Sequence, residues 1–169
     1  MSEIVNRVAQ SGLITIDLSE WVIPGERSVI DLSPQLWQGL VLKETDFRSW
    51  IKENDWTQYQ GQHVAITCST EAIIPTWAFM LVASALSGVA TNLVMGNLET
   101  LNTLLLDRHI QSINISDFQD QRVVVKGCSS SEVTTASYTL LVQKLQPVVK
   151  SLMFGEACST VPLYKAPRK

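Results

Sequence analysis

The sequence predicts an α/β fold built on a small, doubly wound, mostly parallel sheet. From residue 63 onward, short apolar runs alternate with helical segments of similar length, and glycine or small polar residues follow each run. In addition, 46% of the 169 residues are hydrophobic and 17% are charged, which is enough apolar material for a buried core. The expected fold is therefore a covered sheet with a single core.

Residues 1–62 are expected to form a helix-plus-β-hairpin region, either a subdomain or a layer that covers the sheet. Ser2 is a candidate cap for a short helix that stops at Gly12. Two β-rich runs, 13–16 and 29–32, lie on either side of a Pro-Gly turn dipeptide, so we expect them to pair antiparallel.

Residues 63–169 are expected to form the α/β domain proper, packed with the first region as one unit. Right-handed crossovers between parallel strands favour the strand order 2-1-3-4. The predicted strands are 63–67, 89–95, 122–126 and 151–154, and they end near Cys68, Gly96, Cys128 and Cys158. The predicted helices are 72–87, 98–110 and 135–146, and an earlier helix runs from Thr45 to Asn54.

The three cysteines share one local context, in which a strand is followed by cysteine, by serine and then by serine or threonine. Because the carboxyl ends of parallel strands lie on one edge of a sheet, we expect the cysteines to converge there. Thiolate ligands suit zinc or an iron–sulfur cluster, and the hydroxyl groups that follow can donate hydrogen bonds to sulfur. The predicted ligands and their neighbours are Cys68 with Ser69, Cys128 with Ser129, and Cys158 with Ser159.

Two carboxylates lie near these cysteines in the sequence. Glu71 and Glu156 are the candidates for a fourth metal ligand, and a vacant fourth position is the alternative. The same residues support a second hypothesis, an enzyme that uses one cysteine as nucleophile and either glutamate as base. For a single cysteine, the ordinary interpretation is a small, inert core residue.

A third hypothesis is a non-catalytic interaction module. In this interpretation Trp21, Trp37 and Trp56 cover a partner, and the cysteines have no chemical role. The hypotheses differ in what they require of the cysteines, because a ligand set needs all three sulfurs close together and a nucleophile needs only one.

Composition excludes several classes of protein. The net charge of −3 provides no concentrated basic face, which argues against nucleic-acid binding. The longest apolar stretch, 73–86, is shorter than the roughly 20 residues needed to span a bilayer. Because the first residues are acidic and the cysteine count is odd, we expect a cytoplasmic protein without disulfides. The apolar composition suggests a homodimer.

Several segments spread along the chain are distinctive when they are taken together. They are Glu3-Ile4-Val5-Asn6-Arg7-Val8, Thr67-Cys68-Ser69, Ala72-Ile73-Ile74-Pro75-Thr76-Trp77-Ala78, Lys126-Gly127-Cys128-Ser129, Phe154-Gly155-Glu156 and Cys158-Ser159-Thr160-Val161-Pro162. In these motifs nearly the whole chain resembles an uncharacterised bacterial family, the domain of unknown function 2480 (DUF2480). The family carries no established activity. The resemblance implies an association with iron–sulfur cluster assembly by the sulfur-mobilisation system, and hence assembly proteins as partners.

Overall fold

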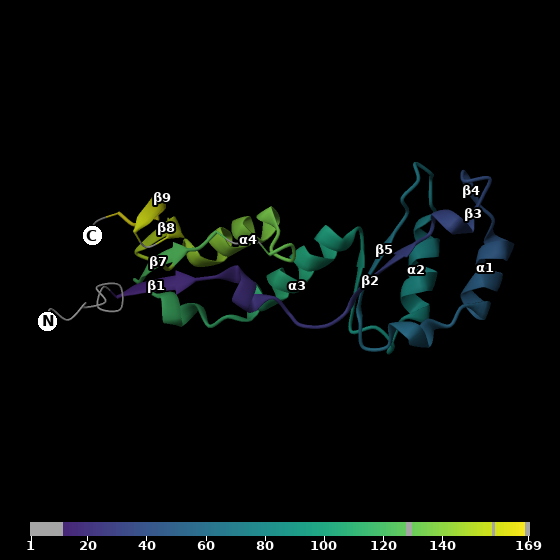
Figure 1. Cartoon of the computed structure of the whole chain (residues 1–169), viewed down its shortest axis with the longest axis horizontal. Helices are drawn as coiled ribbons and strands as arrows, with labels where there is room; N and C mark the ends of the chain where they lie inside the picture. Colours follow the sequence, from purple (N-terminus) through teal and green to yellow (C-terminus); the bar gives the residue numbers. More distant parts are fainter. Residues whose placement is uncertain (1–11, 128–129, 157, 168–169) are drawn as a thin grey trace, which may run out of the picture. The chain divides into compact units, whose positions relative to one another are not determined.

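The computed structural model describes residues 12–127, 130–156 and 158–167, and it confirms the α/β class with mostly parallel sheets. The chain divides into two compact units (Figure 1). Unit 1 consists of Met1–Ile23 together with Leu105–Lys169, and unit 2 consists of Pro24–Leu104. Unit 2 is therefore inserted into the sequence of unit 1.

Unit 2 contains a three-stranded parallel sheet of order β2-β5-β6. A two-residue antiparallel pair, β3 and β4, precedes its first helix. Acidic residues in the first turn of α1 and a lysine in its last turn complement the helix dipole. The elements are β2 (Arg27–Asp31), η2 (Ser33–Gln35), β3 (Leu36–Trp37), β4 (Val41–Leu42), α1 (Glu44–Glu53), η3 (Trp56–Tyr59), β5 (His63–Thr67), α2 (Thr76–Ala85), β6 (Asn92–Met95) and the start of α3 (Leu98–Ser112).

Unit 1 contains a four-stranded sheet of order β1-β7-β8-β9, in which only the β8–β9 pair is antiparallel. The hydroxyl group of Thr134 caps α4 by accepting a hydrogen bond from the Ser137 N–H. The elements are β1 (Leu13–Ile16), η1 (Leu18–Trp21), the end of α3, η4 (Ile115–Phe118), β7 (Arg122–Val125), α4 (Thr135–Leu145), β8 (Ser151–Glu156) and β9 (Ser159–Lys165).

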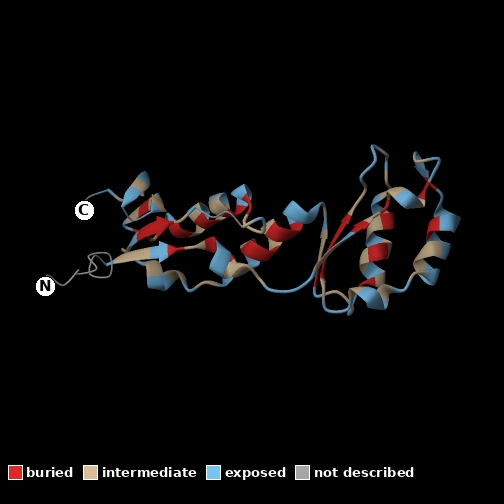
Figure 2. Cartoon of the chain, in the orientation of Figure 1, coloured by how far each residue is buried: buried red, intermediate tan, exposed pale blue. Residues whose placement is uncertain are grey.

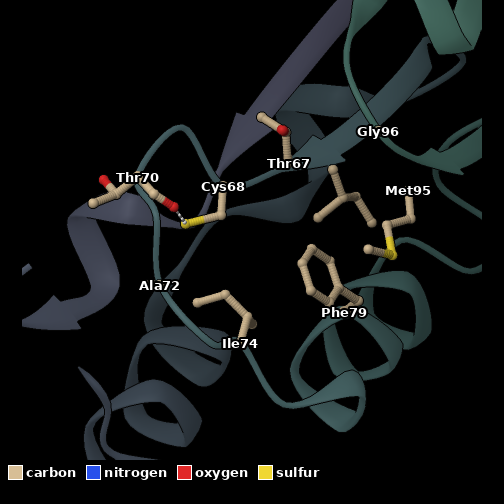
Figure 3. Close-up of a pocket in the computed structure, with 9 residues that line it drawn as sticks. Thr67, Cys68, Thr70, Ala72, Ile74, Phe79, Met95 and Gly96 are labelled. Carbon is tan, nitrogen blue, oxygen red and sulfur yellow. Dashed lines mark hydrogen bonds between the residues drawn. The ribbon is translucent and has the colours of Figure 1, made fainter. Parts of the chain in front are cut away.

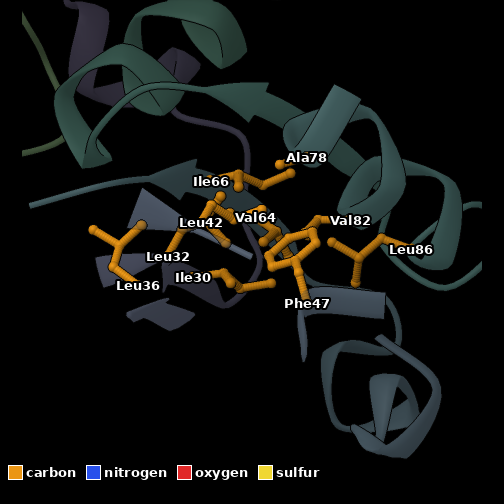
Figure 4. Packing of buried hydrophobic residues seen from close by; sticks show 10 residues of the cluster. All are labelled: Ile30, Leu32, Leu36, Leu42, Phe47, Val64, Ile66, Ala78, Val82 and Leu86. Atoms are coloured by element: carbon orange, nitrogen blue, oxygen red, sulfur yellow. The ribbon is translucent and has the colours of Figure 1, made fainter. Parts of the chain in front are cut away.

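Each unit has its own hydrophobic core. Consecutive buried residues make up most of the central strands β5 and β7, as expected for strands covered on both faces, and buried positions form one face of each helix (Figure 2). In unit 2 the fully buried Phe47 of α1 packs in the same cluster as Val64 of β5 and Val82 of α2 (Figure 4). In unit 1 the corresponding cluster is built on Ile16, Val123 and Leu141.

The two units repeat the same plan. Corresponding residues are separated by the same number of positions: His63 begins β5 as Arg122 begins β7, and Thr76 begins α2 as Thr135 begins α4. The hydrogen bonds repeat as well. The Gly61 N–H donates to Val89 O at 2.8 Å, and in unit 1 the Asp120 N–H donates to Val148 O at 2.8 Å.

The same turn precedes β5 and β7. Gly61 and Asp120 both have positive φ, at 75° and 56°, and each follows a short 3₁₀ helix. These 3₁₀ helices are capped in the same way, by Asp55 on the Thr57 N–H and by Asn114 on the Ser116 N–H. The shared turns indicate that each unit is a copy of one βαβαβ pattern.

The structure corrects two details of the predicted topology. The strands do not form one sheet of order 2-1-3-4, because β5 and β6 pair with β2 whereas β7 and β8 pair with β1. The runs 13–16 and 29–32 do not form a hairpin, because each joins the parallel sheet of its own unit. The predicted helix at Ser2–Gly12 lies outside the described residues, and the expected boundary after residue 62 falls inside unit 2.

Candidate functional site

The carboxyl edge of the unit 2 sheet holds a carboxylate with four hydrogen bonds. Asp31 ends β2, and it accepts from the Ser33 N–H at 3.0 Å and from the Ser33 hydroxyl at 2.8 Å. It also accepts from Ser69, through the N–H at 2.9 Å and through the hydroxyl at 2.5 Å. Because Ser69 follows β5, Asp31 fixes the loop between β5 and α2 to the end of β2.

The ionised form of Asp31 is strongly favoured. Burial by itself raises the pKa of this carboxyl, but the hydrogen bonds from Ser69 and Ser33 outweigh burial and hold its pKa far below the usual range. The loop is therefore held by a permanent negative charge at neutral pH.

The anchored loop forms one wall of a cavity of about 290 Å³ (Figure 3). Cys68 lines it, and the thiol donates a weak hydrogen bond to Thr70 O at 3.5 Å. Figure 3 shows Phe79 and Met95 across the hollow from the Cys68 sulfur. The complete lining is Ile66, Thr67, Cys68, Thr70, Ala72, Ile74, Phe79, Met95 and Gly96.

A second hollow of about 290 Å³ adjoins this cavity along α2 and β6, and Ile66, Phe79 and Met95 line both. Its remaining lining is mostly apolar, and the side chain of Met80 there is 65% exposed. Met95 is 67% exposed. Together the two hollows present a thiol and two threonines at one end and an apolar surface at the other.

The corresponding place in unit 1 is occupied by aromatic rings. Phe154 of unit 1 corresponds to Met95 of unit 2. Val125 pairs with Phe154 in one sheet as Ile66 pairs with Met95 in the other. The rings of Tyr138 and Phe154 pack edge to face with centroids 5.8 Å apart. Gly127 takes the position of Cys68, and a Cβ there would lie 3.3 Å from Phe154 Cζ. Among the described residues of unit 1, two packed aromatic rings therefore stand where Phe79 and Met95 line the cavity of unit 2.

The predicted site residues that the structure describes lie in two different segments, one in each unit. Glu71 is exposed in the loop after Cys68. Cys158 lies in the turn of the β8–β9 hairpin, between Glu156 and Ser159, and all three are exposed. Cys128 and Ser129 lie outside the described residues. Cys68 and Cys158 belong to different units, and both are free thiols.

The predicted function, binding of a metal ion or an iron–sulfur cluster through three cysteines, is wrong. Among the residues that the structure describes, no three His, Cys, Asp or Glu side chains form a group that could hold a metal ion. The physical reason lies in the repeat. Cys68 corresponds to Gly127 rather than to Cys128, and Cys158 follows a strand that turns back into a hairpin. The cysteines therefore do not occupy equivalent strand ends.

The tryptophans of the interaction hypothesis are also in different settings. Trp21 stacks on His109 in unit 1 with centroids 5.2 Å apart. Trp56 donates its indole N–H to Ile51 O at 2.8 Å in unit 2. Trp37 is 49% exposed, with Lys43 Nζ 4.2 Å from its ring centroid. All three rings thus make a contact within their own unit, and Trp37 is the exposed one of the three.

None of the helices in the described part of the chain has the length and apolar character needed to cross a membrane. The predictions about nucleic acid, assembly proteins and a homodimer stay predictions. Sequence reasoning missed Asp31, although a signal was present: Ile16-Asp17-Leu18-Ser19 recurs as Ile30-Asp31-Leu32-Ser33.

Comparison with known proteins agrees with the motifs quoted above. A family model described as "Protein of unknown function (DUF2480)" matches residues 2–166. No curated protein and no solved structure matches the chain. Since the family match spans nearly the full length, the chain belongs to the DUF2480 family.

Proposed function

We propose that the protein is a binding module that takes a small, largely apolar molecule in the Cys68 cavity. The observation that carries the proposal is the hollow of about 290 Å³ at the carboxyl edge of a parallel sheet. Open α/β proteins bind ligands at this edge, in pockets with an apolar lining and a few polar groups. In unit 1 the corresponding described residues are Tyr138 and Phe154, whose rings pack edge to face, so the lining at this edge differs between the two units.

The lining defines the chemistry of the ligand. Phe79 and Met95, continued by the exposed Met80, supply the apolar surface. The Cys68 thiol and the two threonine positions supply hydrogen-bonding groups at the other end. A molecule with an unbranched or planar apolar body and one hydroxyl or carbonyl head group satisfies both ends.

The Asp31 hydrogen bonds supply preorganisation. They hold Ser69, the residue directly after Cys68, through both its N–H and its hydroxyl. A loop that is ordered before binding loses less conformational entropy when the ligand arrives. The cytoplasmic location expected from the sequence belongs to this proposal, because a reducing compartment keeps Cys68 as a free thiol.

Alkylation of the thiols tests the proposal, with 1-octanol as the probe. In a Cys128→Ala variant, mass spectrometry follows the reaction of N-ethylmaleimide at Cys68 and at Cys158. We expect 1-octanol to slow the reaction at Cys68 several-fold and to leave Cys158 unchanged, because Cys158 lies in an exposed turn. Equal slowing at both thiols, or no slowing, contradicts the proposal.

A matched pair of substitutions separates the cavity from general effects. Ala72→Trp places a large side chain in the cavity lining, and we expect it to abolish protection of Cys68. Ser131→Trp introduces the same residue at the corresponding exposed position of unit 1, and we expect protection to persist. Protection that survives Ala72→Trp would show that the probe binds elsewhere.

A further inference from the structure

Unit 1 contains a cavity of a different kind, at the amino edge of its parallel strands. It has a volume of about 470 Å³ and is lined by three cationic side chains together with Tyr164. The complete lining is Arg122, Lys150, Ser151, Met153, Pro162, Tyr164 and Lys165. No acidic residue is among them.

Strand register brings the cations together. Arg122 of β7 pairs with Ser151 of β8, and Ser151 pairs with Lys165 of β9. Residues paired in register point to the same face of a sheet, and neighbouring strands lie about 4.8 Å apart. Arg122 and Lys165 therefore flank Ser151 across three strands, within reach of one small ligand.

Lys150 is held beside this row by its backbone. Its N–H donates to Gln121 O at 2.8 Å, and its carbonyl accepts from the Ala166 N–H at 2.9 Å. These bonds tie it to the residue before Arg122 and to the residue after Lys165. Within the part of the chain that the structure describes, no acidic side chain forms an ion pair with any of the three cations.

Three cations that form no ion pair with any described residue surround one hollow, in a chain whose net charge is −3. Their mutual repulsion is relieved when an anion binds between them. Arginine offers a fork that matches phosphate oxygens, lysine adds point charges, and the Ser151 hydroxyl adds a donor. The cavity lies in the size range of small-molecule sites.

The corresponding place in unit 2 is closed. His63 and Asn92 take the positions of Arg122 and Ser151, and they are 3% and 8% exposed. Their side chains bond to each other at 2.8 Å, and His63 Nε2 lies 3.1 Å from Pro24 O. Unit 2 has no described counterpart of β9, the strand that supplies Tyr164 and Lys165 to the cavity. The cationic hollow is thus specific to unit 1.

We propose that unit 1 binds a small organic phosphate in the cavity formed by Arg122, Lys150, Ser151 and Lys165. Tyr164 lines the same cavity and offers an aromatic surface to the organic part of the ligand. This site lies in the other unit from the Cys68 cavity and does not depend on the function proposed for that cavity.

Calorimetric titration of the full chain tests the site, with inorganic pyrophosphate and adenosine 5′-monophosphate as probes. We expect both to bind, and affinity to fall as salt rises, because the contacts are between exposed charges. We expect Arg122→Gln with Lys165→Gln to weaken binding by about tenfold or more. Each of the two substitutions removes one positive charge from an exposed position, so thermal unfolding should change little.

Lys52→Gln is the matched control for Arg122→Gln alone, because each removes one positive charge from an exposed position, the control in unit 2. We expect it to leave pyrophosphate affinity unchanged. Equal weakening by this control, or no loss in the double variant, overturns the proposal. A single-stranded oligonucleotide that binds much more tightly than either probe also overturns it, because the ligand would then be a nucleic acid.

Discussion

Unit 2 has a cavity at the carboxyl edge of its sheet and a buried, hydrogen-bonded pair at the amino edge, whereas the described residues of unit 1 have packed aromatic rings at the carboxyl edge and a cavity at the amino edge. At the carboxyl edge Cys68 and Met95 leave a cavity, and their counterparts Gly127 and Phe154 pack together. At the amino edge a buried histidine in unit 2 corresponds to the exposed Arg122 in unit 1. The described cavities of the two copies thus lie at opposite edges, each within its own sheet.

The comparison shows that the shared framework and the hollows depend on different residues. The framework consists of caps, turns and buried aliphatic side chains that recur in both units, such as Leu32 and Leu18 or Leu86 and Leu145. The hollows depend on a few residues at the strand ends whose size and charge differ between the two units. Unit 1 additionally carries β9, so its cationic cavity lies where the two copies differ most.

The largest expected effect concerns the core of unit 2. Phe47→Ala removes a fully buried ring that contacts Trp50 and Trp77, and we expect the free energy of unfolding to fall by about 3–5 kcal/mol. Leu106 is the corresponding residue of unit 1, so Phe47→Leu installs the side chain of the other copy. We expect Phe47→Leu to cost less than Phe47→Ala in urea unfolding. Equal losses would show that ring volume is not what unit 2 requires here.

The second-largest expected loss of unfolding free energy comes from replacing Asp31, which lies in one of the two Asp-Leu-Ser turns. Asp31 accepts hydrogen bonds from Ser33 and from Ser69, whereas Asp17 accepts only local bonds from Ser19 among the described residues. We expect Asp31→Asn to cost about 2–4 kcal/mol, since several hydrogen bonds to a charged group are weakened. Asp17→Asn should cost only about a few tenths of a kcal/mol, because asparagine caps a helix about as well as aspartate does.

The pH dependence of the Asp31 effect has a definite sign. Its pKa is lowered in the folded state, so the carboxylate stabilises the fold fully above its unfolded pKa of about 3.9. The stabilisation is lost as pH falls below that value towards the folded pKa. Urea unfolding at pH 7 and at pH 3 should therefore show a smaller difference between wild type and Asp31→Asn at pH 3. A difference that grows at pH 3 would contradict the assignment.

Local structure was predictable from the sequence, whereas the division into two sheets was not. The helix at Thr135–Leu145 and the strand at His63–Thr67 follow from apolar periodicity and from turn residues, which act over a few positions. The pairing of β1 with β7 crosses the whole inserted unit, and strand patterns carry no information about such a distant partner. The recurrence of Ile-Asp-Leu-Ser was the available signal for the repeat.

The candidate site was predicted only in part, for a related reason. Cys68 was correctly placed after a strand that ends at the carboxyl edge of a sheet. Its equivalence with Cys128 and Cys158 was wrong, because similarity over three residues does not establish the same position in a fold. A cavity depends on the volumes of side chains from several elements, such as Phe79 and Met95, and these meet only in the folded chain.

The smallest of the three stability effects concerns the closed amino edge of unit 2. Asn92→Ala removes the partner of the buried His63 ring, and leaving a buried polar nitrogen unpaired costs about 1–3 kcal/mol. Ser151→Ala changes the corresponding residue of unit 1, which lines the cationic cavity and is only partly buried, so unfolding should be nearly unaffected. Urea unfolding of both variants at neutral pH makes the comparison. A loss for Ser151→Ala equal to that for Asn92→Ala would show that the amino edge of unit 1 is as tightly packed as that of unit 2, and it would remove the basis for a ligand cavity there.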